Sequence, residues 1–441
     1  MFTYPSEIIL NLRLAWEMRK REPTEFIPPL PSDQVLKNLF ETAFYASMKA
    51  EENRAVRFRL AYSSTVEHAV HPRGKLPLPF DYLCPSLIEF ETKRGFNVNE
   101  ILRLAPAIDP TKTMILVGPS SILGDSSLEI QGLLDVGKSW WSLLHGYIDT
   151  AVVLPPSLLT ISAIETGSII LSRGGLFLLS LRDGKLWLPV EGILDNSPIA
   201  DFFSEAKNLM HKEVCSKLKS KTSYPKESEI SEVYINNLQR LLFNIREQSH
   251  GGTLIVVPDH LTTKDPRLTD RLSIKYPCEY DVLWEILIES ILLNKKQYSK
   301  GELKISPKIF REYKNLEFQN RLIKDPIFDS ISAISKLANV DGALVITDKF
   351  RLLGFGAEVI ASSPSLKQIM IPGYISGGEL VSNPTSIESF GTRHRSAFRF
   401  CSNYEKSVAF VFSQDGGVKA ITRVGPDVVM WSDIFSGGLS I

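Results

Sequence analysis

The sequence predicts a chain in two parts: a β-rich N-terminal module, then an α/β (α+β) C-terminal domain with a mixed central sheet flanked by helices. Two observations predict this division. Between residues 55 and 187, short apolar runs are separated by Pro and Gly, which is typical of strands and turns. After residue 229, helical apolar periodicity alternates with short continuous apolar runs, which is typical of helices packed on a buried sheet. A chain of 441 residues is also too long for one compact core.

The charge balance excludes several classes of partner. Lys+Arg and Asp+Glu both number 50, so the chain has no net charge to attract DNA or an anionic membrane. We therefore expect no DNA partner and no membrane partner, and any anion site must be local. The four cysteines are scattered without the paired spacing of a zinc site or a disulfide framework. Because the N-terminus also lacks the pattern of a secretion signal, we expect a cytoplasmic protein.

The N-terminal half is expected to begin with helices and continue with strands. Residues 1–54 form a helical segment, in which Ser32 caps a helix with an apolar stripe from Val35 to Phe44. Residues 55–195 form a β-rich regulatory or sensor module. Within it, the glycines and apolar runs of residues 167–179 predict a β-hairpin.

The boundary between the two halves is expected at residues 196–229. Ser197 and Pro198 open a helix that keeps its apolar residues on one side. A polar, lysine-rich stretch over residues 217–223 follows, and such a composition is typical of a solvated linker.

The C-terminal domain is expected over residues 230–441. The charged segment from Lys295 to Lys324 predicts a surface helix or an insertion. Apolar periodicity predicts helices over residues 233–247, 280–293 and 327–338, and continuous apolar runs predict strands over residues 253–257, 341–346, 408–412 and 417–421.

Two short stretches of this domain carry chemistry. Asp341 precedes an apolar strand and is followed by the small residues Gly342 and Ala343, beside which a ligand could approach the backbone closely. Residues 391–395 place two arginines and a histidine behind a glycine and a threonine. Alone, Asp341 would be a helix-to-strand cap, and the basic residues would be a solvated cluster. Their occurrence together favours a site that holds a metal and a polyphosphate.

These stretches resemble a known family. Residues 340–346 (VDGALVI) and 383–397 (NPTSIESFGTRHRSA) are similar to the two signatures of the diadenylate cyclase domain, and most similar to the DNA-integrity-scanning cyclases. The resemblance is strongest over residues 331–424. The N-terminal half resembles instead cyclase-like proteins that have been proposed as nucleotide sensors.

The resemblance implies an activity and a set of site residues. Members condense two ATP molecules into cyclic di-AMP with release of two pyrophosphates, at a site formed between two subunits, so a homodimer or a higher homo-oligomer is implied. Asp341 would bind Mg²⁺ or Mn²⁺ and help to activate the ribose hydroxyl. The resemblance assigns the catalytic role to Asp341, Arg393, His394 and Arg395, and nucleotide binding to Gly342, Ala343, Leu353, Gly354, Gly391, Thr392 and Ser413.

The turn after Ser413 departs from the family pattern. The family has an acidic residue there that assists the metal, and this chain has Gln414 and Asp415. If the ligand position falls on Gln414, a negative charge is lost. If it falls on Asp415, the charge remains on a shorter side chain, and the sequence leaves both alternatives open.

Two functions therefore follow from the sequence. The first is a diadenylate cyclase that the N-terminal module regulates. The alternative is a nucleotide-binding sensor module with weak or no catalysis, which the altered turn and the unfamiliar N-terminal half favour. The intact Asp341 and Arg393 to Arg395 favour the enzyme.

Overall fold

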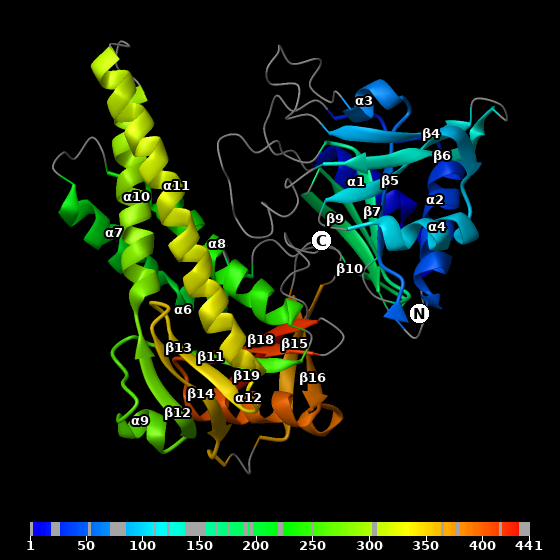
Figure 1. Cartoon of the computed structure of the whole chain (residues 1–441). Helices are drawn as coiled ribbons and strands as arrows, with labels where there is room; N and C mark the ends of the chain where they lie inside the picture. Colours follow the sequence, from blue (N-terminus) through cyan, green and yellow to red (C-terminus); the bar gives the residue numbers. More distant parts are fainter. Residues whose placement is uncertain are drawn as a thin grey trace. The chain divides into compact units, whose positions relative to one another are not determined.

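A computed structural model gives the architecture of the chain (Figure 1). The chain divides into two compact units, Met1–Val190 and Glu191–Ile434. Both are α+β with mixed sheets, which confirms the predicted class. The finer division into four parts stays a prediction. The structure describes residues 3–18, 27–51, 54–70, 85–109, 112–120, 124–136, 156–163, 166–174, 176–182, 184–187, 193–194, 197–218, 224–248, 250–301, 307–362, 366–374, 380–413 and 417–431.

The first unit is built on a sheet with the strand order β10-β9-β8-β7-β3-β5-β6-β4. Strands β3 and β5 are parallel, and the other described pairs are antiparallel. Its strands are β1 (Ala50–Glu51), β2 (Arg54–Ala55), β3 (Phe58–Tyr62), β4 (Ser86–Gly95), β5 (Thr113–Ser120), β6 (Gly124–Asp135), β7 (Leu159–Ala163), β8 (Ile169–Arg173), β9 (Leu176–Arg182) and β10 (Lys185–Trp187). Its helices are η1 (Pro5–Ile8), α1 (Ile9–Met18), α2 (Asp33–Ser47), α3 (Val66–Val70), α4 (Val98–Leu104) and η3 (Ala105–Ala107).

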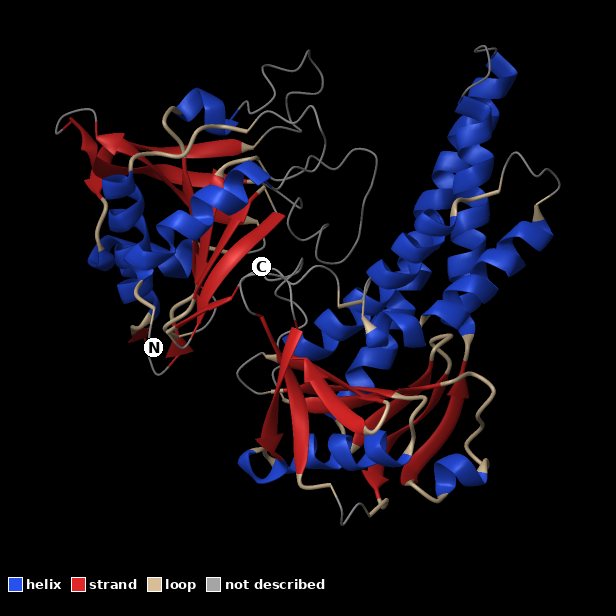
Figure 2. Cartoon of the chain, turned by 180° about the vertical axis from the view of Figure 1, so that it is seen from behind, coloured by secondary structure: helices blue, strands red, loops and turns tan. Residues whose placement is uncertain are grey.

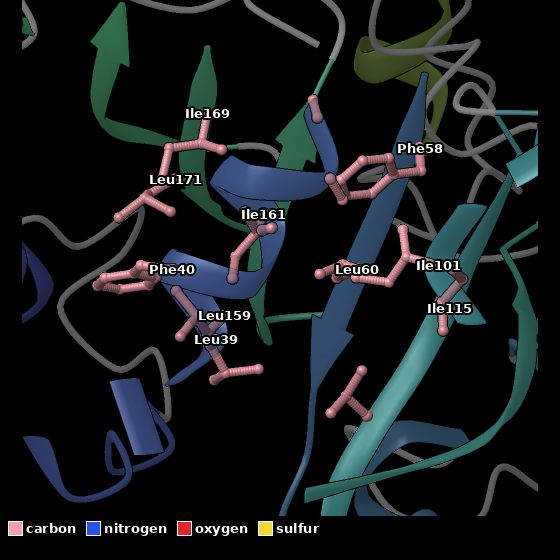
Figure 3. Packing of buried hydrophobic residues seen from close by; sticks show 14 of the residues in the cluster. Leu39, Phe40, Phe58, Leu60, Ile101, Ile115, Leu159, Ile161, Ile169 and Leu171 are labelled. Atoms are coloured by element: carbon pink, nitrogen blue, oxygen red, sulfur yellow. The ribbon is translucent and has the colours of Figure 1, made fainter. Parts of the chain in front are cut away.

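Helix α2 supplies the core of the first unit. Its apolar stripe, which includes Leu39 and Phe40, packs against the inward residues of β3, β7 and β8 (Figure 3). The side chain of Ser32 accepts a hydrogen bond from the Val35 N–H, so the predicted cap is confirmed. Because the stripe recurs at helical spacing, one face of α2 is buried along its whole length.

The predicted strands of the first unit are largely confirmed. The hairpin expected over residues 167–179 is β8 and β9, which pair antiparallel. The first of the short apolar runs that predict strands, residues 56–60, enters its strand β3 at Phe58. The apolar run 151–154 lies outside the described residues.

The second unit is built on a sheet with the strand order β12-β14-β13-β11-β17-β18-β19-β15-β16. Strand β11 is parallel to β13 and antiparallel to β17. Its strands are β11 (Gly252–Val257), β12 (Leu272–Tyr280), β13 (Ala343–Thr347), β14 (Leu352–Val359), β15 (Gln368–Tyr374), β16 (Leu380–Ser386), β17 (Val408–Phe412), β18 (Val418–Val424) and β19 (Asp427–Trp431). Its helices are α6 (Pro198–Phe202), α7 (Ser204–Lys217), α8 (Glu227–Glu247), α9 (Pro266–Thr269), α10 (Val282–Gly301), α11 (Pro307–Lys336), η5 (Leu337–Asn339), η6 (Ile387–Ser389) and α12 (Thr392–Asn403).

Helices cover both faces of this second sheet (Figures 1 and 2). Helix α12 lies across one face, where its apolar residues and the central strands form a buried core. Helices α8, α10 and α11 lie on the other face. The central strands β11, β13 and β17 are therefore buried on both sides, which explains why they are continuous apolar runs in the sequence.

Two parts of the second unit differ from the prediction. The charged segment 295–324, expected as a surface helix or an insertion, includes the end of α10 and the first half of α11, which contact each other. The helix expected to begin at residue 327 begins at Pro307, so it continues through much of the charged segment. Strands β12, β14, β15, β16 and β19 were not predicted, and β12 shows why: it is a half-exposed edge strand with no continuous apolar run.

Candidate functional site

Asp341 stands at the N-terminal end of the buried strand β13, with its side chain exposed. The next residue, Gly342, has a φ of +110°. A Cβ there would lie 2.5 Å from the carbonyl carbon of Gly356 in β14. Glycine is therefore required, because the two backbones approach each other directly beside Asp341.

The basic residues 393–395 belong to the first turn of α12. Gly391 is the N-cap and provides no side-chain capping hydrogen bond. Arg393 is exposed and Arg395 half-buried, and neither forms an ion pair within the described part of the chain. Helix N-termini favour acidic side chains, and this first turn has none. The first turn of α12 therefore concentrates positive charge, although acidic residues at the same positions would stabilise the helix more.

His394 is positioned differently from its neighbours. Its imidazole is half-buried and packs beside the rings of Phe390 and Phe398, with ring centroids 5.7 and 6.3 Å apart. The Lys419 ammonium lies 5.8 Å from the centroid of the Phe390 ring. The imidazole is thus held by packing, whereas the two arginines project from the same turn.

The strand register places Asp341 and the start of α12 at the same end of the sheet. Lys419, which contacts Phe390, pairs with Val411, and the row continues through Thr253 to Ala343. Three strand spacings separate β13 from β18 in this row, or about 14 Å. The predicted carboxylate and the predicted basic turn therefore border one end of the sheet.

Ser413 lies at this end as well, because it directly follows the last residue of β17. Its backbone N–H donates to the Gly417 carbonyl at 2.9 Å and closes the β17–β18 connection. Gln414 and Asp415 lie outside the described residues, so which of them stands at the acidic position stays undecided.

Leu353 and Gly354, two of the residues that the resemblance assigns to nucleotide binding, are close to the interior. Leu353 is fully buried in the core beneath α12. Gly354 has a φ of +152°, and a Cβ there would lie 2.6 Å from the Tyr276 carbonyl oxygen. Next to it, the rings of Tyr276 and Phe355 stack with centroids 4.9 Å apart, a pair that the sequence did not predict.

A second polar cluster, also not predicted, lies at the opposite ends of β11 and β13. Asp259 accepts hydrogen bonds from Thr347 Oγ1 at 2.9 Å and from Arg351 Nε at 3.0 Å. Asp348 accepts one from the Asp259 N–H at 2.9 Å. Burial, and then the charge of Asp259, raises the pKa of Asp348 to about 6. The sequence contained a signal for this polar cluster, because Asp259 follows the apolar run 253–257 and Asp348 follows the apolar run 341–346.

The described residues contain no group of three or more His, Cys, Asp or Glu side chains that could hold a metal ion. Asp341 therefore belongs to no group of three such side chains within that part of the chain. Mg²⁺ is commonly held by one or two carboxylates together with substrate phosphates, so Asp341 fits an ion that arrives with a phosphate ligand. Nor does any helix in the described ranges have the length and apolar character needed to cross a membrane.

Comparison with known families finds a match in the first unit. Residues 25–135 match a family model described as the probable sensor domain DACNV. These residues span α2 to β6 of the first unit. No curated protein and no solved structure matches the chain.

This match corrects the family expected from the sequence. The prediction of a diadenylate cyclase domain protein is wrong, because the family found is a sensor domain in the N-terminal part of the chain. The two strings that suggested the cyclases are a glycine at a strand start and a basic helix N-terminus. Such pieces recur wherever a backbone turns tightly or an anion is bound. Of the two functions considered, the match therefore supports the sensor alternative.

Proposed function

We propose that this protein is a sensor whose second unit binds a nucleotide without converting it. The observation that carries the proposal is the match of residues 25–135 to a probable sensor domain. A sensor requires a binding site and a responsive structure, but it does not require turnover. The predicted nucleotide residues keep their importance in this proposal, as ligand contacts and not as catalysts.

The first turn of α12 supports a polyphosphate ligand. The positive end of the helix dipole favours an anion there. Arg393 and Arg395 add two guanidinium groups, which bind phosphate oxygens in pairs. Thr392 adds a hydroxyl donor, and Gly391 leaves the approach open, since nothing lies within 4 Å of the position of a Cβ.

Asp341 supports a nucleotide that brings a divalent cation. It is exposed at the same end of the sheet and has no ion-pair partner among the described residues. Mg²⁺ or Mn²⁺ bound to the phosphates would be held by this carboxylate.

Calorimetric titration with ATP and Mg²⁺ tests the proposal. We expect saturable binding by the full chain and recovery of the nucleotide unchanged after incubation. Exchange of both Arg393 and Arg395 for Gln removes charge-assisted hydrogen bonds, each worth about 1.5–3 kcal/mol, so affinity should fall at least tenfold. The matched control is Arg399→Gln, which removes an exposed arginine from the same helix beyond its first turn.

Either of two results would contradict the proposal. One is the absence of nucleotide binding by a folded chain. The other is conversion of ATP to a product, which would contradict the assignment of this unit to sensing. Equal weakening by Arg399→Gln would show that only the general charge of α12 matters.

A further inference from the structure

Helix α11 has an exposed face that is apolar at its centre. The helix contacts α8 and α10, and Ile327, Ile331 and Ile334 are buried on one side of it. On the opposite side, Phe318 is 59% exposed and Leu322 is 55% exposed. Because residues four apart on a helix are neighbours, these two side chains form one apolar patch.

This patch lies away from the candidate nucleotide site. The first half of α11 extends beyond the sheet beside α10 (Figures 1 and 2). Between Leu322 and the end of the helix at Lys336, the backbone rises by about 21 Å before the chain reaches Asp341. The patch is therefore a surface of its own, and no described element of the second unit covers it.

The exposed positions of this face follow the spacing of a coiled-coil seam. Residues 311, 315, 318, 322, 325 and 329 are separated alternately by four and three residues, and all six are exposed. Such spacing keeps side chains on one line along a helix that packs against a second helix. We call this line the α11 seam, which consists of Arg311, Asn315, Phe318, Leu322, Asp325 and Asp329. Its centre is apolar and its ends are polar.

The charges of the α11 seam favour one way of pairing two copies. In a parallel pair, Arg311 and Asp329 would each face the same residue of the other copy, and like charges repel. In an antiparallel pair centred on residue 320, Arg311 of one copy faces Asp329 of the other, at both ends of the seam. Neither residue forms an ion pair with another described side chain. The same pairing sets Phe318 of each copy against Leu322 of the other.

We propose that two copies of this chain associate through antiparallel α11 seams, which bury Phe318 and Leu322 of both copies at the centre. The pairing has a two-fold axis near residue 320, so both copies use the same surface. Because the apolar centre is small, the dimer is weak and its population depends on concentration. The dimer that the family resemblance implied would join two nucleotide sites, whereas this dimer joins the first halves of two α11 helices.

Sedimentation velocity of the full chain, between about 1 and about 100 µM, tests the association. We expect a monomer–dimer equilibrium. Phe318→Ser should weaken it at least tenfold, because the substitution removes an aromatic side chain from each copy. The matched control is Ile360→Ser, which replaces another apolar residue of the second unit that is 54% exposed and should leave the equilibrium unchanged. Since both side chains are exposed, neither substitution should lower the melting temperature of the monomer.

Two charge variants test the antiparallel orientation. Arg311→Asp and Asp329→Arg each place like charges opposite one another at both ends of the seam, so each variant alone should dimerise about tenfold more weakly. In an equal mixture, the two variants should form a heterodimer in which both ion pairs are present. A chain with both substitutions should also self-associate as the original chain does.

Several results would overturn the proposal. One is a chain that stays monomeric at every concentration, and a lower melting temperature of monomeric Phe318→Ser would then identify the first unit of the same chain as the cover. Dimerisation that Phe318→Ser does not weaken, or that mixing of the charge variants does not restore, would overturn it as well. The measurement uses the chain without nucleotide, so failure of the nucleotide proposal would be recognised separately.

Discussion

At the scale of single residues, the second unit contains a buried carboxyl group that opposes folding at neutral pH. Asp348 is 8% exposed and faces the carboxylates of Asp259 and Glu205, with Lys349 as the opposing cation. Its pKa is raised to about 6 from 3.8, chiefly by burial. The folded state therefore holds this proton more tightly than the unfolded state does. Stability from this group is present below about pH 4 and is lost as the pH rises through about 6.

Asp348→Asn should therefore stabilise the protein at pH 8. The asparagine oxygen can still accept the hydrogen bond from the Asp259 N–H, while the buried charge is removed. The free energy of unfolding should increase by at most about 3 kcal/mol, which is the cost of ionising the buried carboxyl group in the folded state. This increase should shrink towards pH 4, where the carboxyl group of the wild-type protein is protonated in the folded state. Denaturant unfolding of both proteins at several pH values measures it. Asp270→Asn, at an exposed aspartate, should show no such pH-dependent difference, and a gain independent of pH would contradict this account.

At the scale of elements, α12 combines a strong apolar face with an unfavourable first turn. Ala397, Phe398 and Phe400 are fully buried against the sheet, so the helix is stabilised by packing. That packing allows basic residues at an N-terminus where acidic ones are preferred. A local rule broken within an otherwise consistent element is typical of a functional position.

Arg393→Glu should accordingly change stability and nucleotide binding in opposite directions. A negative charge at the helix N-terminus interacts favourably with the dipole, so the free energy of unfolding should rise by about 0.3–1 kcal/mol at low salt. Nucleotide affinity should fall, because phosphate oxygens would meet a carboxylate. Thermal denaturation with and without ATP and Mg²⁺ measures both effects. A loss of stability together with unchanged binding would show that Arg393 is a structural residue.

At the scale of the whole molecule, each unit has its own core. One core joins α2 to the first sheet, and the other joins α12 to the second. Units with separate cores are expected to unfold as separate transitions.

Differential scanning calorimetry should therefore show two transitions. Gly342→Ala provides a selective probe, because its Cβ would meet the Gly356 backbone and its φ of +110° is strained for alanine. The substitution should cost about 1–3 kcal/mol and lower only the transition of the second unit. Gly167→Ala, a glycine with positive φ but open space, should lower only the other transition, and by less. A single transition that shifts with both variants would contradict independent unfolding.

The sequence determined the class of the fold and the elements with one buried face. Helix α2 and strands β11, β13 and β17 followed directly from apolar periodicity, because burial selects apolar residues at fixed spacing. The edge strand β12 is half-exposed and has no continuous apolar run, so it was found only in the structure.

Only the tertiary structure decided how the site residues are arranged. Local sequence places Asp341 before a strand and Arg393 after a glycine, but the strand register brings both to one end of the sheet. In the first unit, register likewise aligns Arg59 with Ser162, residues that lie more than a hundred positions apart in the chain. Pairings between distant segments depend on the packing of the whole sheet, and no local pattern encodes them.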